Sequence, residues 1–356
     1  MRSRLLWSLL AVGLAATRAA DYPTPREGDV MLRDFAFHSG EILPEVRLHY
    51  RAIGTPRRDA QGLVSNAVLL LHGTGGTGKS LLRAEFADEL FDPGQPLDAK
   101  KYFLILPDAL GSGQSSKPSD GLRAKFPRYG YRDLVVATHR MLTEGLGVNH
   151  LRLILGTSQG GMLAWLWGEH HPEFADALLP LASAPGPIAG RNRAWRRLAI
   201  DAVRGDPGWA EGNYTAQPPA LHTVAAMFFL VSSNPVLRLA EAPTLARADA
   251  VFDAYVADFV KTHDTNDVLF ALESSRDYDS SAALEKIRAP LLAINSADDY
   301  VNPPELGLLE REIARVPRGR AVVLPPGPDT RGHQSHSHAR LWKDELVRLL
   351  AESEPK

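Results

Sequence analysis

The stretch LRLILGTSQGGMLAW, residues 151–165, decides the fold of this chain. Its first five residues are almost all aliphatic, which is typical of a parallel-sheet strand that is covered on both faces. Gly156 to Gly160 then have the pattern G-x-S-x-G, and an amphipathic helical pattern follows and stops at Pro172. This order predicts a strand, a sharp turn that carries Ser158, and a helix.

The G-x-S-x-G spacing has a mechanical reason. In a strained strand-to-helix turn, the residues two before and two after the serine come close together, and only very small residues fit. The turn lifts the serine hydroxyl above the sheet, where it can act as a nucleophile. A chance match is the alternative, because the chain contains 29 glycines. The strand before, the helix after and the partners further along the chain favour a nucleophile at Ser158.

Residues 1–20, MRSRLLWSLLAVGLAATRAA, have the features of an export signal, with early arginines, an apolar stretch and small residues suited to cleavage near Ala19 or Ala20. A membrane anchor is the alternative, but the apolar run is short for a spanning helix. We therefore expect a periplasmic or secreted protein with no stable membrane insertion after signal removal. The sequence has no cysteine, which excludes disulfides and thiol chemistry, and its net charge of -2 gives no reason to expect nucleic acid binding.

The rest of the chain alternates between strand and helix patterns. An opening antiparallel pair is expected within residues 32–54. Further buried strands are expected at residues 66–71, 102–106, 177–181, 290–295 and 321–324, and helices at 131–146 and 339–350. This order predicts an α/β fold with a doubly wound, mostly parallel sheet. Reactive groups in such sheets gather at the carboxyl ends of the strands, and Ser158 follows one of them.

Between residues 185 and 282 the pattern changes to helical runs such as 193–203 and 250–261, with no buried strand apparent. We therefore divide the chain into a signal segment (1–20), a first part of the core (21–184), a helical insertion (185–282) and a second part of the core (283–356). An insertion of this length between two strands predicts a lid over the site. A helical layer with no gating role is the alternative, and composition does not separate the two.

Gly73 to Ser80, GTGGTGKS, directly follows a buried strand and supports two interpretations. It satisfies the phosphate-loop pattern G-x-x-x-x-G-K-[ST], which predicts nucleotide binding. In the other interpretation it is the turn after the third strand of the sheet, and the backbone N–H of Thr74 joins that of Gln159 in an oxyanion hole. We prefer the second, because an exported protein meets little ATP or GTP and a phosphate loop leaves the serine turn unexplained.

Three segments resemble the homoserine O-acetyltransferase branch of the α/β-hydrolase superfamily. They are GTSQGGM at the serine turn, PDALGSGQSSKPS from Pro107, and RNRAWRRLAIDAVRGDPGWAEGNY from Arg191 to Tyr214. The similarity extends over nearly all of the chain after residue 20. It implies a core sheet flanked by helices, a helical lid, and a catalytic triad in the chain order Ser, Asp, His. The branch includes hydrolases as well as transferases, so membership does not settle the reaction.

The resemblance implies a triad acid and a triad base on two loops late in the chain. Asp299 stands four residues before a proline, as the family's aspartate does, and Asp298 is the near alternative. His333 directly follows a glycine, as in the family, and can turn one ring nitrogen toward the serine and the other toward the carboxylate. His336 and His338 then only flank the site. A metal site at the three histidines is the alternative, but no further ligand cluster accompanies them.

Two residues of the predicted lid are candidates for substrate binding. Arg197 falls where a substrate-binding arginine of the family would be carried over, with Arg196 beside it. Trp195 and the apolar run 227–229 favour an apolar acyl or alcohol portion of the substrate. Thr157 stands where the acetyltransferases usually have glycine, which points away from transferase activity.

These features predict an exported serine hydrolase in which His333 takes the proton of Ser158, Asp299 orients the imidazole, and Ser158 attacks an acyl ester or lactone. Water is the expected acyl acceptor, because acetyl-CoA is a cytoplasmic metabolite. The alternatives are an acyl-CoA-dependent O-acyltransferase, a phosphate-loop nucleotide-binding protein, and a binding-only hydrolase fold, which is disfavoured because no triad position is missing. We expect a small-molecule ester or lactone as the partner and neither cofactor nor metal, and homodimerisation is left open.

Overall fold

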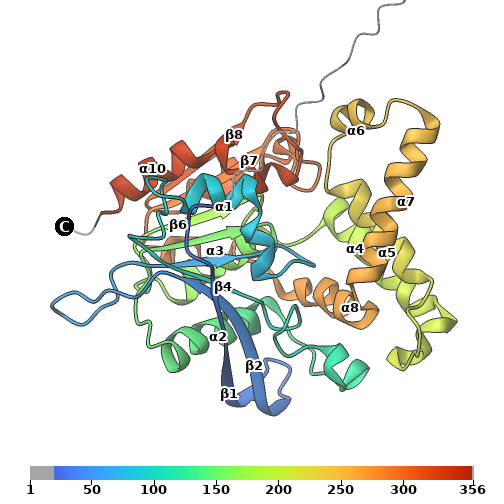
Figure 1. The fold of residues 1–356 in the computed structure, drawn as a ribbon, viewed down its shortest axis with the longest axis horizontal. Helices are drawn as coiled ribbons and strands as arrows, with labels where there is room; N and C mark the ends of the chain where they lie inside the picture. Colours follow the sequence, from blue (N-terminus) through green and yellow to red (C-terminus); the bar gives the residue numbers. More distant parts are fainter. Residues whose placement is uncertain (1–19, 355–356) are drawn as a thin grey trace, which may run out of the picture.

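A single eight-stranded sheet forms the centre of the computed structural model, which describes residues 20–354 (Figure 1). Residues 1–19 of the predicted signal segment lie outside the described residues. The strands are β1 (Arg26–Ala36), β2 (Ile42–Ile53), β3 (Ala67–Leu71), β4 (Phe103–Pro107), β5 (Leu153–Thr157), β6 (Leu178–Leu181), β7 (Leu291–Ser296) and β8 (Gly319–Leu324). Their order across the sheet is β1-β2-β4-β3-β5-β6-β7-β8.

All strands from β4 to β8 in that order run parallel, whereas β2 is antiparallel to both β1 and β4. This confirms the predicted α/β fold with a mostly parallel sheet and an opening antiparallel pair. Every residue of the central strands β3, β4, β5 and β6 is buried, as their continuous aliphatic sequences require. Because parallel strands end at the same edge, the loops after β3, β5, β7 and β8 are brought together there.

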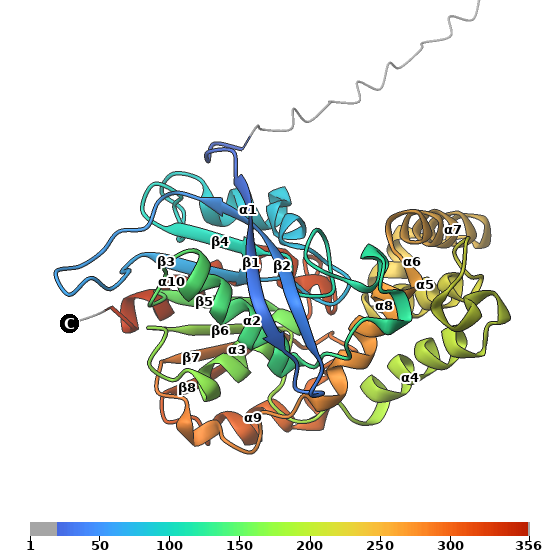
Figure 2. The ribbon, with the colours of Figure 1, turned by 90° about the horizontal axis from the view of Figure 1, so that it is seen from below.

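Helices cover both faces of the sheet (Figure 2). Within the described residues they are α1 (Ala84–Phe91), α2 (Tyr131–Arg140), α3 (Gln159–His170), α4 (Gly190–Gly205), α5 (Ala220–Val231), α6 (Pro235–Glu241), α7 (Leu245–Thr262), α8 (Thr265–Glu273), α9 (Leu308–Ile313) and α10 (Lys343–Glu352). Buried side chains of α2, α3 and α9 pack in one apolar core, and those of α1 and α10 pack in another across the sheet. The result is the layered arrangement expected of a doubly wound sheet.

Two helices differ from the sequence-based expectation in their bounds. The predicted helix 131–146 changes after α2 into a π-helical turn over Met141–Gly145. The last α-helix begins at Lys343 rather than at 339, because Trp342 leaves helical geometry with φ -140°. The buried Trp342 ring packs against Phe86 with 5.8 Å between ring centroids, and its Nε1–H donates to the carbonyl of His336. Packing of this ring against α1 therefore moves the start of α10 to Lys343.

Helices α4 to α8 all lie between residues 185 and 282, and Figure 1 shows them together on one side of the sheet. They have an apolar core of their own, which includes Trp195, Ala199, Leu221, Val224 and Phe259. In the described part of the chain no single helix is long and apolar enough to cross a membrane. Only α5 and α6 taken together reach the required length and hydropathy, and the two are bent by 105°.

Candidate active site

Ser158 occupies the strained turn that the G-x-S-x-G pattern predicts. It links β5 to α3 with φ 53° and ψ -111°, a conformation that side chains other than glycine rarely adopt. A Cβ atom on Gly156 would lie 1.9 Å from the carbonyl oxygen of Gly160, and one on Gly160 would lie 2.1 Å from that of Leu71. Both positions therefore require glycine. The turn holds the serine hydroxyl at the carboxyl end of β5.

A hydrogen-bonded chain joins Ser158, His333 and Asp299. The distance from Ser158 Oγ to His333 Nε2 is 2.8 Å, and that from His333 Nδ1 to Asp299 Oδ2 is also 2.8 Å. A carboxylate can only accept, so Nδ1 carries the proton and Nε2 is free to accept the serine proton. The structure thus brings together the three residues that the resemblance selected, in the geometry that a nucleophile, a base and an orienting acid require.

Asp299 is 1% exposed, and its carboxylate is stabilised by several donors. Its Oδ1 accepts from the backbone N–H of Val301 at 2.7 Å and of Asn302 at 3.2 Å. Burial alone would raise the pKa of Asp299, but the neighbouring His333 and these hydrogen bonds outweigh burial and hold the pKa below its usual value. The carboxylate is therefore ionised and can stabilise a positive charge on His333.

Asp298, the alternative acid, makes no contact with the imidazole. Its Oδ2 accepts from the Thr330 hydroxyl at 2.8 Å, from Asn234 Nδ2 at 2.7 Å and from the backbone N–H of Gly332 at 3.1 Å. Gly332 has φ +59° and lies tightly against residues 233–234, so it needs to be glycine. Asp298 shapes the loop that presents His333, and of the two carboxylates only that of Asp299 contacts the imidazole.

Near the serine, the backbone N–H groups of Thr74 and Gln159 have no acceptor within the described residues. Gln159 is the first residue of α3, where helix N–H groups have no intrahelical partner. The loop that carries Thr74 is held by His72, whose Nδ1–H donates to Gly73 O at 2.8 Å and whose Nε2 accepts from Ala109 N–H at 3.0 Å. Burial lowers the pKa of His72, so this bridge is neutral. Both N–H groups remain available to an oxyanion.

Three N–H groups of the GTGGTGKS loop that a phosphate would need are already bonded within the protein. Those of Gly76, Thr77 and Gly78 donate to Gly73 O, Ser80 Oγ and Asp108 Oδ1, respectively. Asp108 is 1% exposed and also accepts from Arg51 and from the Gln114 N–H, so it ties the GTGGTGKS loop to the loop after β4. A phosphate loop needs such N–H groups free to surround its ligand. The structure therefore gives no support to the phosphate-loop interpretation.

A pocket of about 380 Å³ opens over Ser158 and His333, and residues of the helical segment 185–282 line its other side. Trp195 and Phe228 line this catalytic pocket and contact each other edge to face, with 5.5 Å between ring centroids. Phe229, by contrast, packs among the helices and does not line the pocket. Trp195 thus lies in the wall of the catalytic pocket, and its contact with a substrate stays a prediction.

The choice of Arg197 as a substrate-binding residue needs correction. Its side chain is 64% exposed and pairs with Asp201, one turn further along α4, at 2.6 Å. Arg196 is only 2% exposed and lines the catalytic pocket. Because consecutive helical residues point about 100° apart, the two arginines face opposite environments. The helical spacing of the sequence indicates that Arg196 faces inward, because the apolar residues Ala199 and Ile200, three and four positions later, are buried on the same face of α4.

Arg196 has no countercharge in the part of the chain that the structure describes. Its Nε–H donates to Asn192 Oδ1 at 3.1 Å, and its guanidinium lies 4.7 Å from the centre of the Trp195 ring. Its Nη1 is buried without a hydrogen-bond partner, as are the hydroxyls of Tyr131 and Thr74. Burial lowers the pKa of Arg196 because it penalises the charged form. A buried cation of this kind needs a partner; the nearby Tyr131 hydroxyl offsets only part of the effect of burial on its pKa, and Arg196 lines the catalytic pocket.

The three histidines of the 333–338 loop do not form a metal site. His336 lies edge to face with His333, with 5.4 Å between ring centroids. Burial lowers the pKa of His336 to about 3, so its ring is neutral at physiological pH. Among residues 20–354, no three or more histidine and carboxylate side chains come together in a way that could hold a metal ion.

Comparison with known proteins identifies the class to which this architecture belongs. A family model described as the alpha/beta hydrolase fold matches residues 66–327. The chain therefore belongs to the α/β-hydrolase family. Among solved structures, an acetylester hydrolase from Corynebacterium glutamicum has a TM-score of 0.80 at 19% identity, covering 92% of this chain and 96% of that one. A homoserine O-acetyltransferase from Bacillus anthracis has a TM-score of 0.79 at 20% identity, covering 92% and 98%. At such identities these matches show the fold alone.

Sequence relatives identify the branch. A protein of Methanothermobacter thermautotrophicus named a probable acyltransferase is 29% identical over 301 residues, which is 82% of this chain and 88% of the relative. The homoserine O-acetyltransferase of Thermobifida fusca is 34% identical over 217 residues, or 57% of this chain and 56% of the relative. Within the α/β-hydrolase family, the chain thus falls in the homoserine O-acetyltransferase-like branch, as the motifs indicated.

Proposed function

We propose that this protein is a serine hydrolase that cleaves a carboxylic ester or a lactone. The observation that carries the proposal is the hydrogen-bonded chain from the Ser158 hydroxyl through His333 to the buried Asp299. His333 accepts the serine proton as Ser158 Oγ attacks the acyl carbon, and Asp299 stabilises the resulting imidazolium. The backbone N–H groups of Thr74 and Gln159 hold the negative charge on the former carbonyl oxygen.

The same groups then release the alcohol and hydrolyse the acyl-enzyme. His333 returns the proton to the leaving alcohol as the ester bond breaks, which leaves the acyl group on Ser158. Water then attacks this acyl-enzyme while His333 takes its proton, and the acid is released when the proton returns to Ser158. No further cofactor enters these steps.

Two features favour water as the acyl acceptor. Residues 1–20 have the composition of an export signal, so we place the protein in the periplasm or outside the cell, where acetyl-CoA is not supplied. Thr157 occupies the position before the nucleophile where the acetyltransferases usually have glycine. Its buried side chain lies in the wall of the catalytic pocket, with Oγ1 3.4 Å from Leu71 O. The extra side chain narrows the space in which an acceptor alcohol has to fit.

One observation favours a second candidate, an O-acyltransferase of the homoserine O-acetyltransferase type. The unpaired Arg196 in the catalytic pocket fits the carboxylate of an amino-acid alcohol as well as that of an anionic ester. The names of the sequence relatives point in the same direction. The two candidates share the acyl-enzyme and differ in whether water or an alcohol reaches it.

The deciding experiment offers two kinds of acyl donor, esters or lactones and acetyl-CoA, to the purified protein lacking residues 1–20. A broad panel of esters and lactones is assayed for hydrolysis, and acetyl-CoA is assayed with and without homoserine. We expect ester or lactone hydrolysis that homoserine does not divert. Efficient formation of O-acetylhomoserine from acetyl-CoA, with negligible hydrolysis across the panel, would overturn the hydrolase proposal in favour of the second candidate.

Arg196→Met should raise the KM for an ester that carries a carboxylate by about tenfold or more, because a charge-assisted hydrogen bond in a buried site is lost. The KM for a neutral ester of the same size should stay within about threefold. The matched control is Arg197→Met on the exposed face of α4, which should change neither value by more than about twofold. Equal losses on both esters would show that Arg196 only packs the pocket wall.

A further inference from the structure

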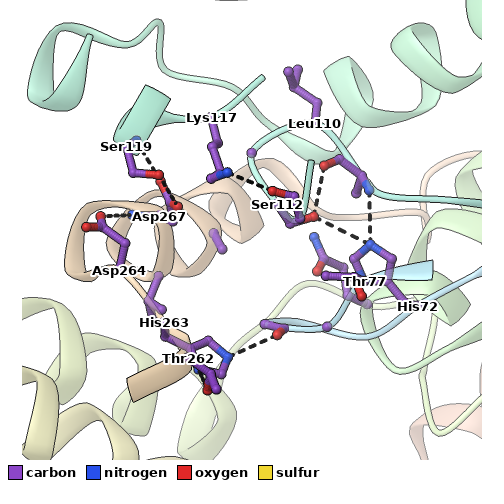
Figure 3. A pocket seen from close by; sticks show the side chains of 18 of the residues that line it. His72, Thr77, Leu110, Ser112, Lys117, Ser119, Thr262, His263, Asp264 and Asp267 are labelled. Atoms are coloured by element: carbon purple, nitrogen blue, oxygen red, sulfur yellow. Dashed lines mark hydrogen bonds between the residues drawn. The ribbon is translucent and has the colours of Figure 1, made fainter. Parts of the chain in front are cut away.

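A second cavity lies beside the catalytic pocket, between the loops after β3 and β4 and helix α8 (Figure 3). Its volume is about 360 Å³, close to that of the catalytic pocket at about 380 Å³. Both cavities are lined by the same four residues, His72, Gly75, Gly76 and His263. These residues form a partition between the two spaces.

His263 is the part of the partition that comes from the helical segment. It directly follows α7, and its Nε2 lies 3.1 Å from Gly75 O while its Nδ1 lies 3.0 Å from Phe259 O. Its ring stacks on Phe259, with 3.9 Å between ring centroids and 5° between the planes. The imidazole is therefore fixed to α7 on one side and to the loop that carries Thr74 on the other.

The other three residues of the partition contribute either no side chain or a side chain that is held in place by the loops. Gly75 and Gly76 have none, and the His72 ring is held by hydrogen bonds to Gly73 O and Ala109 N–H. A shorter residue at 263 removes the side-chain part of the wall and leaves this loop bracing in place. The size of the catalytic pocket on this side thus depends on the side chains of His72 and His263, and His263 is the one that does not brace Gly73 and Ala109.

We propose that His263 is a specificity-determining residue that ends the catalytic pocket and limits the length of the ester chain the enzyme accepts. This inference rests on the proposed ester hydrolysis at Ser158. Leu110, Val268 and Ala271 give the cavity behind the partition an apolar part, next to polar groups such as Lys117 and Asp267, and this apolar part suits an alkyl chain once the wall is removed. Each methylene that enters such a space improves binding by a factor of about four.

The test compares kcat/KM for p-nitrophenyl butyrate and p-nitrophenyl dodecanoate. Wild-type protein should prefer butyrate, and His263→Ala should raise the dodecanoate-to-butyrate ratio at least about tenfold, since several methylenes gain a site. His263→Gln is the matched control, because its amide can still donate to Gly75 O and retains much of the bulk. Its ratio should stay within about threefold of the wild-type ratio.

Ala271→Phe shows where the long chain goes, because Ala271 lines the second cavity and not the catalytic pocket. Alone, it should leave butyrate hydrolysis unchanged. Combined with His263→Ala, it should return the ratio to near its wild-type value by filling the second cavity. The proposal is wrong if His263→Ala keeps butyrate activity without a change in ratio, or if Ala271→Phe fails to cancel the gain.

A measurement on wild-type protein covers the case in which His263→Ala does not fold. Butyl and dodecyl fluorophosphonates are compared by their rates of covalent labelling of Ser158, followed by peptide mass spectrometry. Labelling should be at least about tenfold faster with the butyl reagent, and equal rates would overturn the partition. A failure of the proposed function looks different, because neither reagent would then label Ser158 and butyrate would not be hydrolysed.

Discussion

Ser158→Ala should lower ester turnover by about four to six orders of magnitude. The hydroxyl is the proposed nucleophile, and His333 Nε2, the proposed base, lies 2.8 Å away. Without it, water must attack the bound ester directly, aided only by the oxyanion donors. The measurement is initial-rate kinetics on the best ester of the panel, with thermal unfolding as the check that the variant is folded.

A fluorophosphonate probe gives an independent measurement at the same residue. It should label Ser158 in the wild-type protein and nothing in Ser158→Ala. Ser232→Ala is the matched control, because Ser232 lines the same pocket but does not contact the triad. That variant should keep turnover within about threefold. Labelling at another serine, or undiminished labelling of Ser158→Ala, would refute the assignment of the nucleophile.

His333→Ala should reduce turnover at least about a thousandfold, and Asp299→Asn by about three to four orders of magnitude. An asparagine at 299 turns a donor or a weaker acceptor toward His333 Nδ1, which no longer secures the tautomer with a free Nε2. Both variants should bind the ester nearly as well as the wild type, so the loss should appear in kcat. Steady-state kinetics on one neutral ester measure both effects.

Two neighbouring residues serve as controls for the acid and the base. Asp298→Asn should be at least about tenfold less damaging than Asp299→Asn, because Asp298 bonds Thr330, Asn234 and Gly332 and not the imidazole. His338→Ala should have little effect, since His338 lies outside the catalytic pocket. If Asp298→Asn were the worse of the two aspartate variants, the orienting acid would be the other carboxylate.

Much of the fold could be predicted because its determinants are local. The aliphatic runs that became β3, β4, β5 and β6 bury both faces, and their spacing with helices allows few arrangements other than a parallel sheet. The bounds of the last helix could not be predicted in this way. They depend on where the Trp342 ring meets Phe86, which is a contact between segments far apart in the chain.

The sequence predicted some residues of the candidate site and missed others. The positions of Ser158 and His333 depended on a turn pattern and on a glycine beside the histidine, both visible in the sequence. Arg196 was missed, although the apolar spacing of α4 points it inward, because the motif comparison aligned Arg197 instead. The position of His263 against Gly75 has no sequence signal, since the two residues are 188 positions apart.

The sequence by itself determined the α/β-hydrolase fold, the strained turn at Ser158 and the loop that presents His333, because steric limits and apolar periodicity act between near neighbours. Only the tertiary structure decided that Asp299 rather than Asp298 faces the imidazole, and that Arg196 rather than Arg197 lines the catalytic pocket. It also decided that the N–H of Gly78 in the GTGGTGKS loop is bonded to Asp108 and is not free for a phosphate. Each of these outcomes depends on which atoms of distant segments come within about 3 Å of each other, and a linear pattern does not encode that proximity.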